Sequence, residues 1–206
     1  MSAGRSVNTL SQSWCTPAKY VNAVRKFFDG RIDLDPCSNI SSIVHANTEF
    51  ILPQDGLKEN WNFERIYVNP PYGADRVRGT TIKDWLIKCC QAHELYGAEV
   101  IALIPVASNT SHWKQCIFGK ANAICFLYDT RLRFLIDGSE EHKGAPMACC
   151  LVYWGENVPK FINVFMEYGA VVDITTLQKQ IIGKDRLYAG SLFPDYSNAT
   201  RAACAP

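Results

Sequence analysis

The hydrophobic positions of the chain fall into two patterns, which predict helices and strands in turn. Apolar residues at three- and four-residue spacing are typical of amphipathic helices, whereas short continuous apolar runs are typical of buried strands. Thr16-Pro17 has the form of a helix start, because a hydroxyl suits the cap and a proline suits the first helical position. The predicted helices cover residues 16–30, 82–96, 111–118 and 161–168, and the predicted strands cover 32–35, 48–52, 66–68, 100–104, 123–127, 147–154 and 171–174.

This alternation of strands and helices predicts an α/β fold. We expect one mostly parallel, twisted sheet with right-handed crossovers and helices on both faces. The length of 206 residues and the hydrophobic content of 48% fit a single core. We therefore expect one domain at 14–180, between a flexible N-terminal leader at 1–13 and a loosely packed C-terminal tail at 181–206.

Composition excludes several classes of protein. A formal net charge of +1 argues against a strongly basic nucleic-acid coat, although a neutral total can conceal a local basic face. The nine cysteines include no C-x-x-C pair and lie mostly in apolar runs, as buried cysteines do in a reducing compartment. The four histidines show no metal-ligand spacing, and no apolar run approaches the ~20 residues of a membrane span. We expect a cytosolic (cytoplasmic) protein with no metal site and no membrane segment.

The most informative motif is Asn69-Pro70-Pro71-Tyr72, which directly follows the apolar run at 66–68. Two prolines end strand pairing, so the motif is expected at the carboxyl edge of the sheet, where open α/β folds bind ligands. The Asn69 side-chain oxygen and the Pro70 carbonyl can each accept a hydrogen bond from an amino group, and Tyr72 offers a ring face to a planar base. By itself, the motif is equally compatible with an ordinary turn after a strand.

Two acidic segments are predicted to lie beside this motif. Asp33 and Asp35 stand at the end of the first predicted strand, before Pro36, and Asp55 opens an Asp-Gly turn. A carboxylate in a crevice between strand ends can accept hydrogen bonds from ribose hydroxyls or from an amino group. Taken alone, these aspartates are also compatible with solvated strand ends and an ordinary turn.

Several short motifs occur along the chain in a characteristic order. They are W-C-T-P (14–17), D-L-D-P-C-S (33–38), D-G-L (55–57) with Trp61, Y-V-N-P-P-Y-G (67–73), W-L-I-K (85–88), L-I-P (103–105) and R-L-R-F (131–134). Each motif is weak alone, but the set in this order is specific. From Trp14 to about Trp154, the chain resembles the phage-type Dam-like DNA N6-adenine methyltransferases, which use S-adenosylmethionine.

The resemblance implies a Rossmann-like S-adenosylmethionine-dependent methyltransferase fold and gives roles to individual residues. The residues implied to bind the cofactor are Thr16, Pro17, Asp33, Asp35, Pro36, Cys37 and Asp55. The implied catalytic residues are Asn69, Pro70, Pro71 and Tyr72, and Phe134 is the candidate second aromatic wall of the base pocket. The stretch Asp-Pro-Cys-Ser-Asn departs from the wider class by lacking its glycine pair, and the ribose contact stays open between Asp35 and Glu49.

The implied reaction transfers a methyl group to N6 of an adenine that is flipped out of double-stranded DNA and stacked on Tyr72. Two acceptors on the amino group would favour a tetrahedral nitrogen aimed at the methyl group. Arg76, Arg78, Arg131 and Arg133 are candidate contacts to DNA, and each is equally compatible with a solvated surface. We expect a short recognition sequence read by loops. The oligomeric state stays open, and a monomer is compatible with the sequence.

Other functions remain compatible with the same residues. Because two acceptors suit any planar amino group, a methyltransferase acting on a protein glutamine amide or an RNA base is one alternative. Those families typically carry a glycine-rich first motif, which is missing here. A catalytically inactive module that binds S-adenosylmethionine or DNA is another, although the intact Asn69-Pro70-Pro71-Tyr72 argues against it. A dinucleotide-dependent oxidoreductase is disfavoured, since no G-x-G-x-x-G follows a predicted strand.

Overall fold

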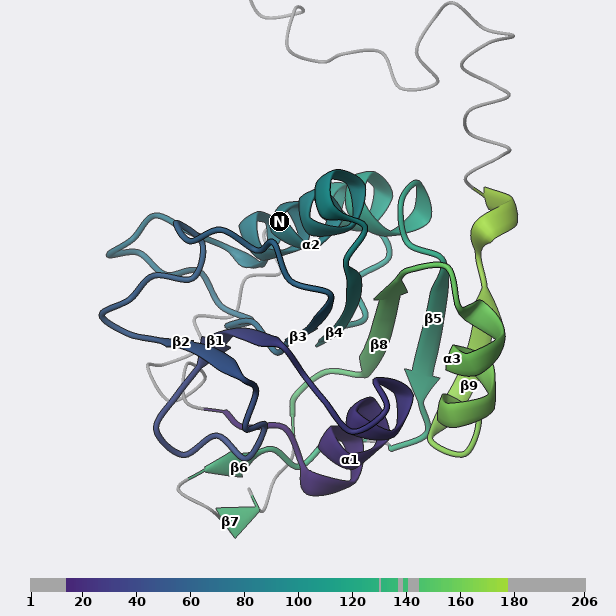
Figure 1. The fold of residues 1–206 in the computed structure, drawn as a ribbon, viewed down its shortest axis with the longest axis horizontal. Coiled ribbons are helices and arrows are strands. Elements are labelled where there is room, and N and C mark those ends of the chain that lie inside the picture. Colours follow the sequence, from purple (N-terminus) through teal and green to yellow (C-terminus); the bar gives the residue numbers. More distant parts are fainter. Residues whose placement is uncertain (1–13, 130, 137–138, 141–144, 178–206) are drawn as a thin grey trace, which may run out of the picture.

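A seven-stranded sheet organises the protein (Figure 1). The structure is a computed structural model that describes residues 14–129, 131–136, 139–140 and 145–177, so the leader and tail expected at 1–13 and 181–206 lie outside the described residues. The strands, in spatial order, are β2 (Thr48–Ile51), β1 (Leu34–Ser38), β3 (Arg65–Val68), β4 (Glu99–Pro105), β8 (Cys149–Trp154), β5 (Ala123–Leu127) and β9 (Gly169–Asp173).

The sheet has a parallel half and an antiparallel half. The pairs β1–β2, β1–β3 and β3–β4 are parallel, and the pairs β4–β8, β5–β8 and β5–β9 are antiparallel. The expectation of a mostly parallel sheet therefore holds for β2–β1–β3–β4 and fails beyond β4. A continuous apolar run such as 149–154 shows that a strand is buried on both faces, but it does not show the direction of the strand.

Helices cover both faces of the sheet. In Figure 1, α2 (Ile82–Tyr96) lies above the sheet and α1 (Ala18–Phe27) lies below it. The helix α3 (Val158–Phe165) packs with α1, and η2 (Trp113–Phe118), a short π-helix, packs with α2. Successive residues of a strand point to opposite faces of the sheet. Tyr67 belongs to the core between the sheet and α1, whereas Ile66 and Val68 belong to the core between the sheet and α2. The α/β class with two covered faces is confirmed.

The helix starts differ in part from their predicted form. Thr16 does not cap α1, because the residue before the helix is Pro17, and no side chain caps this end. The start of α3 was also predicted too late: Asn157 accepts from the Lys160 backbone N–H at 3.2 Å, so the helix begins at Val158. The helix α2 has its predicted bounds, with the Thr81 backbone N–H donating to Asp84 at 2.7 Å, and it ends before Gly97 at a φ of 69°.

Two strand predictions were incomplete. Pro36 was expected to end the first strand, but β1 continues through it to Ser38. The pairing of β1 with β2 shifts register between Asp35 and Ser38, and a proline is tolerated at such an irregularity because no ladder hydrogen bond is required of it. No strand was predicted in the polar segment after 129, yet it contains the short strands β6 (Leu135–Ile136) and β7 (Ser139–Glu140), which pair antiparallel.

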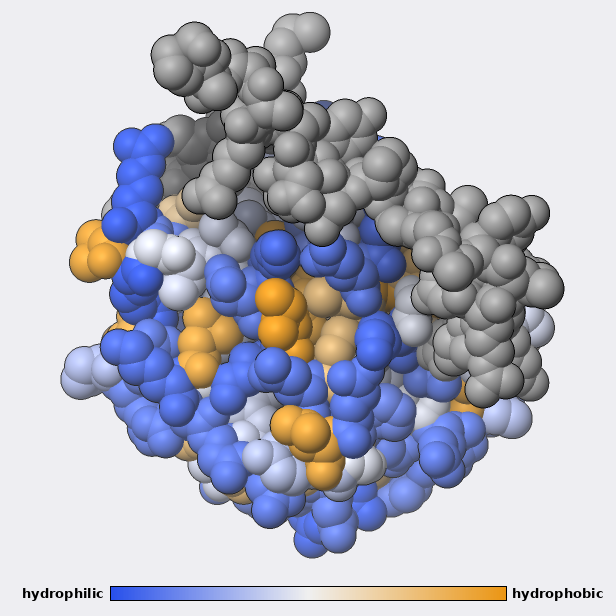
Figure 2. Space-filling view, turned by 90° about the horizontal axis from the view of Figure 1, so that it is seen from above, coloured by the Kyte–Doolittle hydropathy of each residue, from blue (hydrophilic) through white to orange (hydrophobic). Residues whose placement is uncertain are grey.

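The described surface is mainly hydrophilic where Figure 2 views it, with hydrophobic side chains in separate patches. Of the cysteines in the described residues, all but Cys37 are buried, as small apolar side chains are. No helix in the described part of the chain is long and apolar enough to cross a membrane. Within the same residues, no group of three or more histidine, cysteine, aspartate or glutamate side chains is arranged to hold a metal ion.

Candidate active site

Asn69 lies directly after β3, and its side chain is held in one orientation. The amide nitrogen Nδ2 donates to the backbone carbonyl of Trp14 at 2.9 Å. Pro70 and Pro71 follow and end the pairing of the strand, as predicted. Since the Trp14 carbonyl occupies the NH₂ side of the amide, the acceptor oxygen Oδ1 is turned away from that bond. Asn69 is thus oriented to accept a hydrogen bond from an amino group.

The segment that holds Asn69 comes from the beginning of the described chain. Cys15 forms two backbone hydrogen bonds with Leu135, each 2.9 Å long, which fix the segment beside the R-L-R-F stretch. The Thr16 hydroxyl and the Tyr67 hydroxyl lie 2.7 Å apart in the core. These contacts tie residues 14–16 to β3 on one side and to the segment at 131–136 on the other.

Three aromatic rings pack together, and one of them belongs to Trp14, whose carbonyl holds Asn69. Trp14 stacks on Phe134 with centroids 5.0 Å apart and planes inclined by 13°, and Tyr72 meets the edge of this pair, 5.7 Å from Phe134 and 6.4 Å from Trp14. The Tyr72 hydroxyl donates to the Leu103 carbonyl at 3.2 Å, and burial raises the pKa of Tyr72. Phe134 is completely buried, whereas Tyr72 and Trp14 are half-buried. Tyr72 and Phe134 are therefore brought together.

Cys37 and Asp35 approach Asn69 from β1. The Asn69 backbone N–H hydrogen bonds to the Cys37 thiol, and the Cys37 backbone N–H donates to Asp35 at 3.1 Å. Asp35 is 4% exposed, and burial, with the charge of Glu49 as a smaller cause, raises its pKa to about 7. Asp35 is consequently a carboxyl group that changes its charge near neutral pH.

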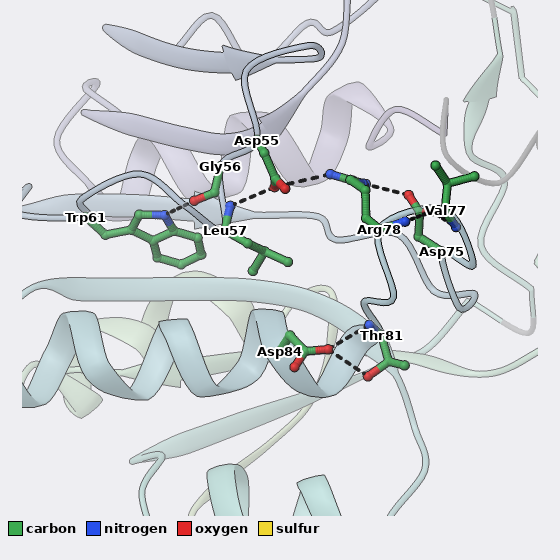
Figure 3. Close-up of polar contacts among 9 residues, drawn as sticks. All are labelled: Asp55, Gly56, Leu57, Trp61, Asp75, Val77, Arg78, Thr81 and Asp84. Carbon is green, nitrogen blue, oxygen red and sulfur yellow. Dashed lines mark hydrogen bonds and ion pairs between the residues drawn. The ribbon is translucent and has the colours of Figure 1, made fainter.

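Asp55 lies over the same end of β1 (Figure 3). Its Oδ1 accepts from the Leu57 backbone N–H at 3.2 Å, and the Trp61 indole donates to the Gly56 carbonyl at 2.8 Å. A Cβ atom added to Gly56 would stand 1.8 Å from the Pro36 carbonyl oxygen, so only glycine allows the turn to approach β1 this closely. The structure therefore brings Asp55 beside Pro36, as the sequence predicted.

Asp33 is not brought to this edge. Its backbone N–H donates to the Arg65 carbonyl at the start of β3, four residues before Asn69, which corresponds to about 13 Å along the strand. Its carboxylate pairs with Arg31 at 2.8 Å and accepts from Asn47 at 3.3 Å. A cavity of about 470 Å³, lined in part by Asp33, opens at this amino edge of the sheet. Cofactor binding by Asp33 thus stays a prediction without support from its position.

The four candidate DNA-binding arginines fall into two groups. Arg76, Arg131 and Arg133 are exposed. Arg78 is instead largely buried and forms ion pairs with Asp55 at 3.2 Å and with Asp75 at 2.7 Å (Figure 3). Contacts of these arginines with DNA stay predictions.

Sequence reasoning missed the part that Trp14 plays. Its carbonyl orients Asn69 and its ring stacks on Phe134, yet only Thr16 and Pro17 of the W-C-T-P motif were assigned a role. The signal was present, because the motif was recognised as a whole. The hydrogen bond to the Trp14 carbonyl could not be predicted, because every residue has a backbone carbonyl and only the fold determines which one faces Asn69.

Comparison with known proteins agrees with the motifs. A family model described as DNA N-6-adenine-methyltransferase (Dam) matches residues 5–179 of the 206-residue chain. Comparisons with curated proteins and with solved structures find no match. The matched range includes every element described above and both sides of the site around Asn69. The chain therefore belongs to the Dam family of DNA N6-adenine methyltransferases.

Proposed function

We propose that the protein transfers the methyl group of S-adenosylmethionine to N6 of an adenine flipped out of double-stranded DNA. The observation that carries this proposal is the orientation of Asn69, whose NH₂ group is held by the Trp14 carbonyl at 2.9 Å. An amide held in this way presents an acceptor, and the amino group of adenine is a donor. The family supplies the reaction class, and the fixed acceptor gives this chain a means of performing it.

The residues beside Asn69 fit a cationic nucleoside cofactor within a Rossmann-like methyltransferase fold. Asp35 and Asp55 are acceptor-only groups when ionised, and they lie at the same end of β1 as Cys37, which contacts Asn69. Asp55 uses Oδ1 for its contacts to Leu57 and Arg78, so Oδ2 is the oxygen suited to the adenine amino group of the cofactor. When bound, S-adenosylmethionine supplies an electrophilic methyl group on a positively charged sulfur.

Three features of the chain would act on the target adenine. Asn69 Oδ1 and the Pro70 carbonyl accept from the two N6 hydrogens, which draws the nitrogen lone pair out of conjugation with the ring. Tyr72 provides a stacking surface for the flipped base, and its bond to Leu103 fixes the ring. The completely buried Phe134 and the half-buried Trp14 pack beside Tyr72 and would limit the access of water to the reacting nitrogen. The reaction needs no covalent intermediate on the protein.

Transfer of labelled methyl groups tests this function directly. Purified protein is incubated with methyl-labelled S-adenosylmethionine in three parallel reactions. The first contains duplex DNA, the second total RNA, and the third a protein that carries an accessible glutamine. We expect label in DNA, as N6-methyladenine. Sequencing of the methylated DNA then gives the recognition sequence. Label in RNA or protein but not in DNA would overturn the proposed substrate, and no transfer with retained cofactor binding would favour the inactive module.

A further inference from the structure

The loop that follows the catalytic motif is held closed by its own contacts. Asp75 and Thr80 exchange backbone hydrogen bonds of 2.8 and 3.1 Å. Asp75 Oδ1 also accepts from the backbone N–H groups of Val77 and Arg78, at 2.9 and 3.0 Å. Gly79 permits the reversal with a φ of 67°. The stretch at 75–80, here called the tip loop, is consequently a preformed turn.

Arg78 joins the tip loop to the Asp55 turn. Its Nε donates to Asp75 Oδ2 at 2.7 Å and its Nη1 donates to Asp55 Oδ1 at 3.2 Å, and Figure 3 shows the side chain lying between the two carboxylates. The exposed fractions of the three side chains are 20% for Arg78, 11% for Asp55 and 10% for Asp75. Charge-assisted hydrogen bonds that are this well shielded from water are stronger than ordinary surface ion pairs.

The other end of this connection is fixed to the sheet. Leu57 and Trp61 hold the Asp55 turn from within, and Gly56 packs directly against the Pro36 carbonyl of β1. Because the Asp55 turn is anchored to β1, the position of Arg78, and through Arg78 that of the tip loop, depends on the contacts made at Asp55.

The outer residues of the tip loop face solvent. Val77 is 97% exposed, and Arg76 is also exposed. An arginine and an apolar side chain on a rigid turn, four and five residues after Tyr72, suit contact with a DNA backbone and with unstacked bases. Arg78 lies on the same loop but points inward, so its chemistry is different from that of Arg76.

We propose that Arg78 is a positioning residue that couples cofactor binding at Asp55 to DNA binding at the tip loop. This proposal rests on the proposed function. A cofactor that engages Asp55 favours the arrangement in which Arg78 bridges the two loops, and DNA bound at Arg76 and Val77 favours the same arrangement. Each ligand then strengthens the binding of the other by the same factor. Lysine cannot replace Arg78 fully, because an ammonium group lacks the planar fork that reaches two carboxylates.

Binding measurements with and without the second ligand test this coupling. The ligand is a fluorescent DNA duplex that carries the recognition sequence identified by sequencing. Its dissociation constant is measured with and without the unreactive product S-adenosylhomocysteine. The proteins compared are wild type, Arg78→Ala, Arg78→Lys and Arg76→Ala. We expect the product to tighten DNA binding by wild type at least fivefold. For Arg78→Ala this factor should fall to about one, and Arg78→Lys should give an intermediate value. Arg76→Ala should weaken DNA binding with the factor unchanged.

The outcomes separate this proposal from the proposed function. If Arg78→Ala weakens DNA binding and its salt dependence but keeps the wild-type factor, Arg78 is a phosphate contact and the coupling role is wrong. A wild-type factor of one overturns it as well. Calorimetry of S-adenosylhomocysteine with the wild-type protein alone tests the cofactor site, and a wild type that binds neither ligand would overturn both proposals. Thermal denaturation verifies that each variant is folded, and Arg78→Lys serves should Arg78→Ala not fold.

Discussion

The two halves of the sheet contribute in different ways. Strands β2, β1, β3 and β4 run parallel, so their carboxyl ends meet at one edge, where Cys37 near the end of β1 meets Asn69 directly after β3. Strands β8, β5 and β9 alternate in direction, so their ends are divided between two edges. That half carries stacked rings instead, with Phe161 between Tyr153 and Phe165. Parallel pairing thus concentrates chemistry, and the antiparallel half supplies packing.

The largest expected effect lies in the packing half. Phe161 is completely buried and stacks on Tyr153 at 5.0 Å. Phe161→Ala should lower the free energy of unfolding by about 3–5 kcal/mol, because it removes a ring and leaves a cavity. Urea denaturation measures this loss. The rate of methyl transfer at low temperature should stay within about twofold of wild type. A tenfold change in rate would need a change of about 1.36 kcal/mol in the activation free energy, and Phe161 is not part of the candidate site. A large loss of turnover in a folded variant would break the comparison.

The next effect lies at the parallel edge. Asn69→Ala removes the oriented acceptor, and we expect methyl transfer to fall by about 10²–10³-fold or more, the range for loss of one preorganised group. Stability and S-adenosylhomocysteine binding should change little. Asn62→Ala is a matched control, because Asn62 lies beside the cavity at the amino edge and should tolerate the same change. Comparable turnover in Asn69→Ala and wild type would exclude the mechanism.

A smaller effect is expected at Tyr72. Tyr72→Ala should weaken the complex with a flipped base by about 1–3 kcal/mol, the range for one lost stacking contact. Tyr72→Phe keeps the ring and loses only the 3.2 Å bond to Leu103, so it should bind more nearly like wild type. Fluorescence of 2-aminopurine at the target position reports the flipped state. If Tyr72→Ala gives the full fluorescence response, the base stacks elsewhere.

The smallest effect is a pH dependence from Asp35. Burial raises its pKa to about 7, so Asp35, one of the two residues proposed to accept from ribose, loses its charge as the pH falls below 7. We expect the dissociation constant of S-adenosylhomocysteine to rise about tenfold from pH 8 to pH 6, following one titration with a pKa near 7. Asp35→Asn should be nearly independent of pH in this range. An equal slope in Asp35→Asn would assign the titration to another group.

The same shift has a consequence for the stability of the protein without ligand. Because the pKa of Asp35 is higher in the folded state than its ordinary value of 3.8, the folded state holds the proton over a range where the unfolded chain has lost it. The contribution of Asp35 is therefore fully favourable below about pH 4 and is lost as the pH rises towards 7. Urea denaturation of wild type and Asp35→Asn at pH 5 and pH 8 isolates this contribution.

Local patterns predicted what depends on neighbouring residues in the sequence. The bounds of α2 follow from its three- and four-residue apolar spacing and a terminal glycine, and the position of Asn69 follows from two prolines after an apolar run. Asp55 was also expected in the crevice between these strand ends, and Gly56 next to it does pack against the Pro36 carbonyl of β1.

Contacts between distant segments were beyond such patterns. Arg78 was a candidate for DNA contact or for a solvated surface. Its charge is visible in the sequence, but its ion pairs with Asp55 and Asp75 are not. Asp33 and Asp35 lie two residues apart in one motif, yet β1 begins between them. Asp33 therefore lies at the amino edge of the sheet, where it pairs with Arg31, and Asp35 lies within the strand. The direction of β8 depends on how the chain returns to the sheet after β5, which no residue pattern records.

The hydrogen bond between Asn69 and the Trp14 carbonyl depends on a residue that is synthesised much later than either partner. The segment that contains Trp14 is made first, but it is fastened by Leu135, which is made after β5. A nascent chain that already contains the whole catalytic motif therefore lacks the means to orient it. A fragment ending before 131–136 would carry Asn69, Pro70, Pro71 and Tyr72 but would lack the partner that fastens the Trp14 segment, together with β8 and β9, so we expect it to be inactive.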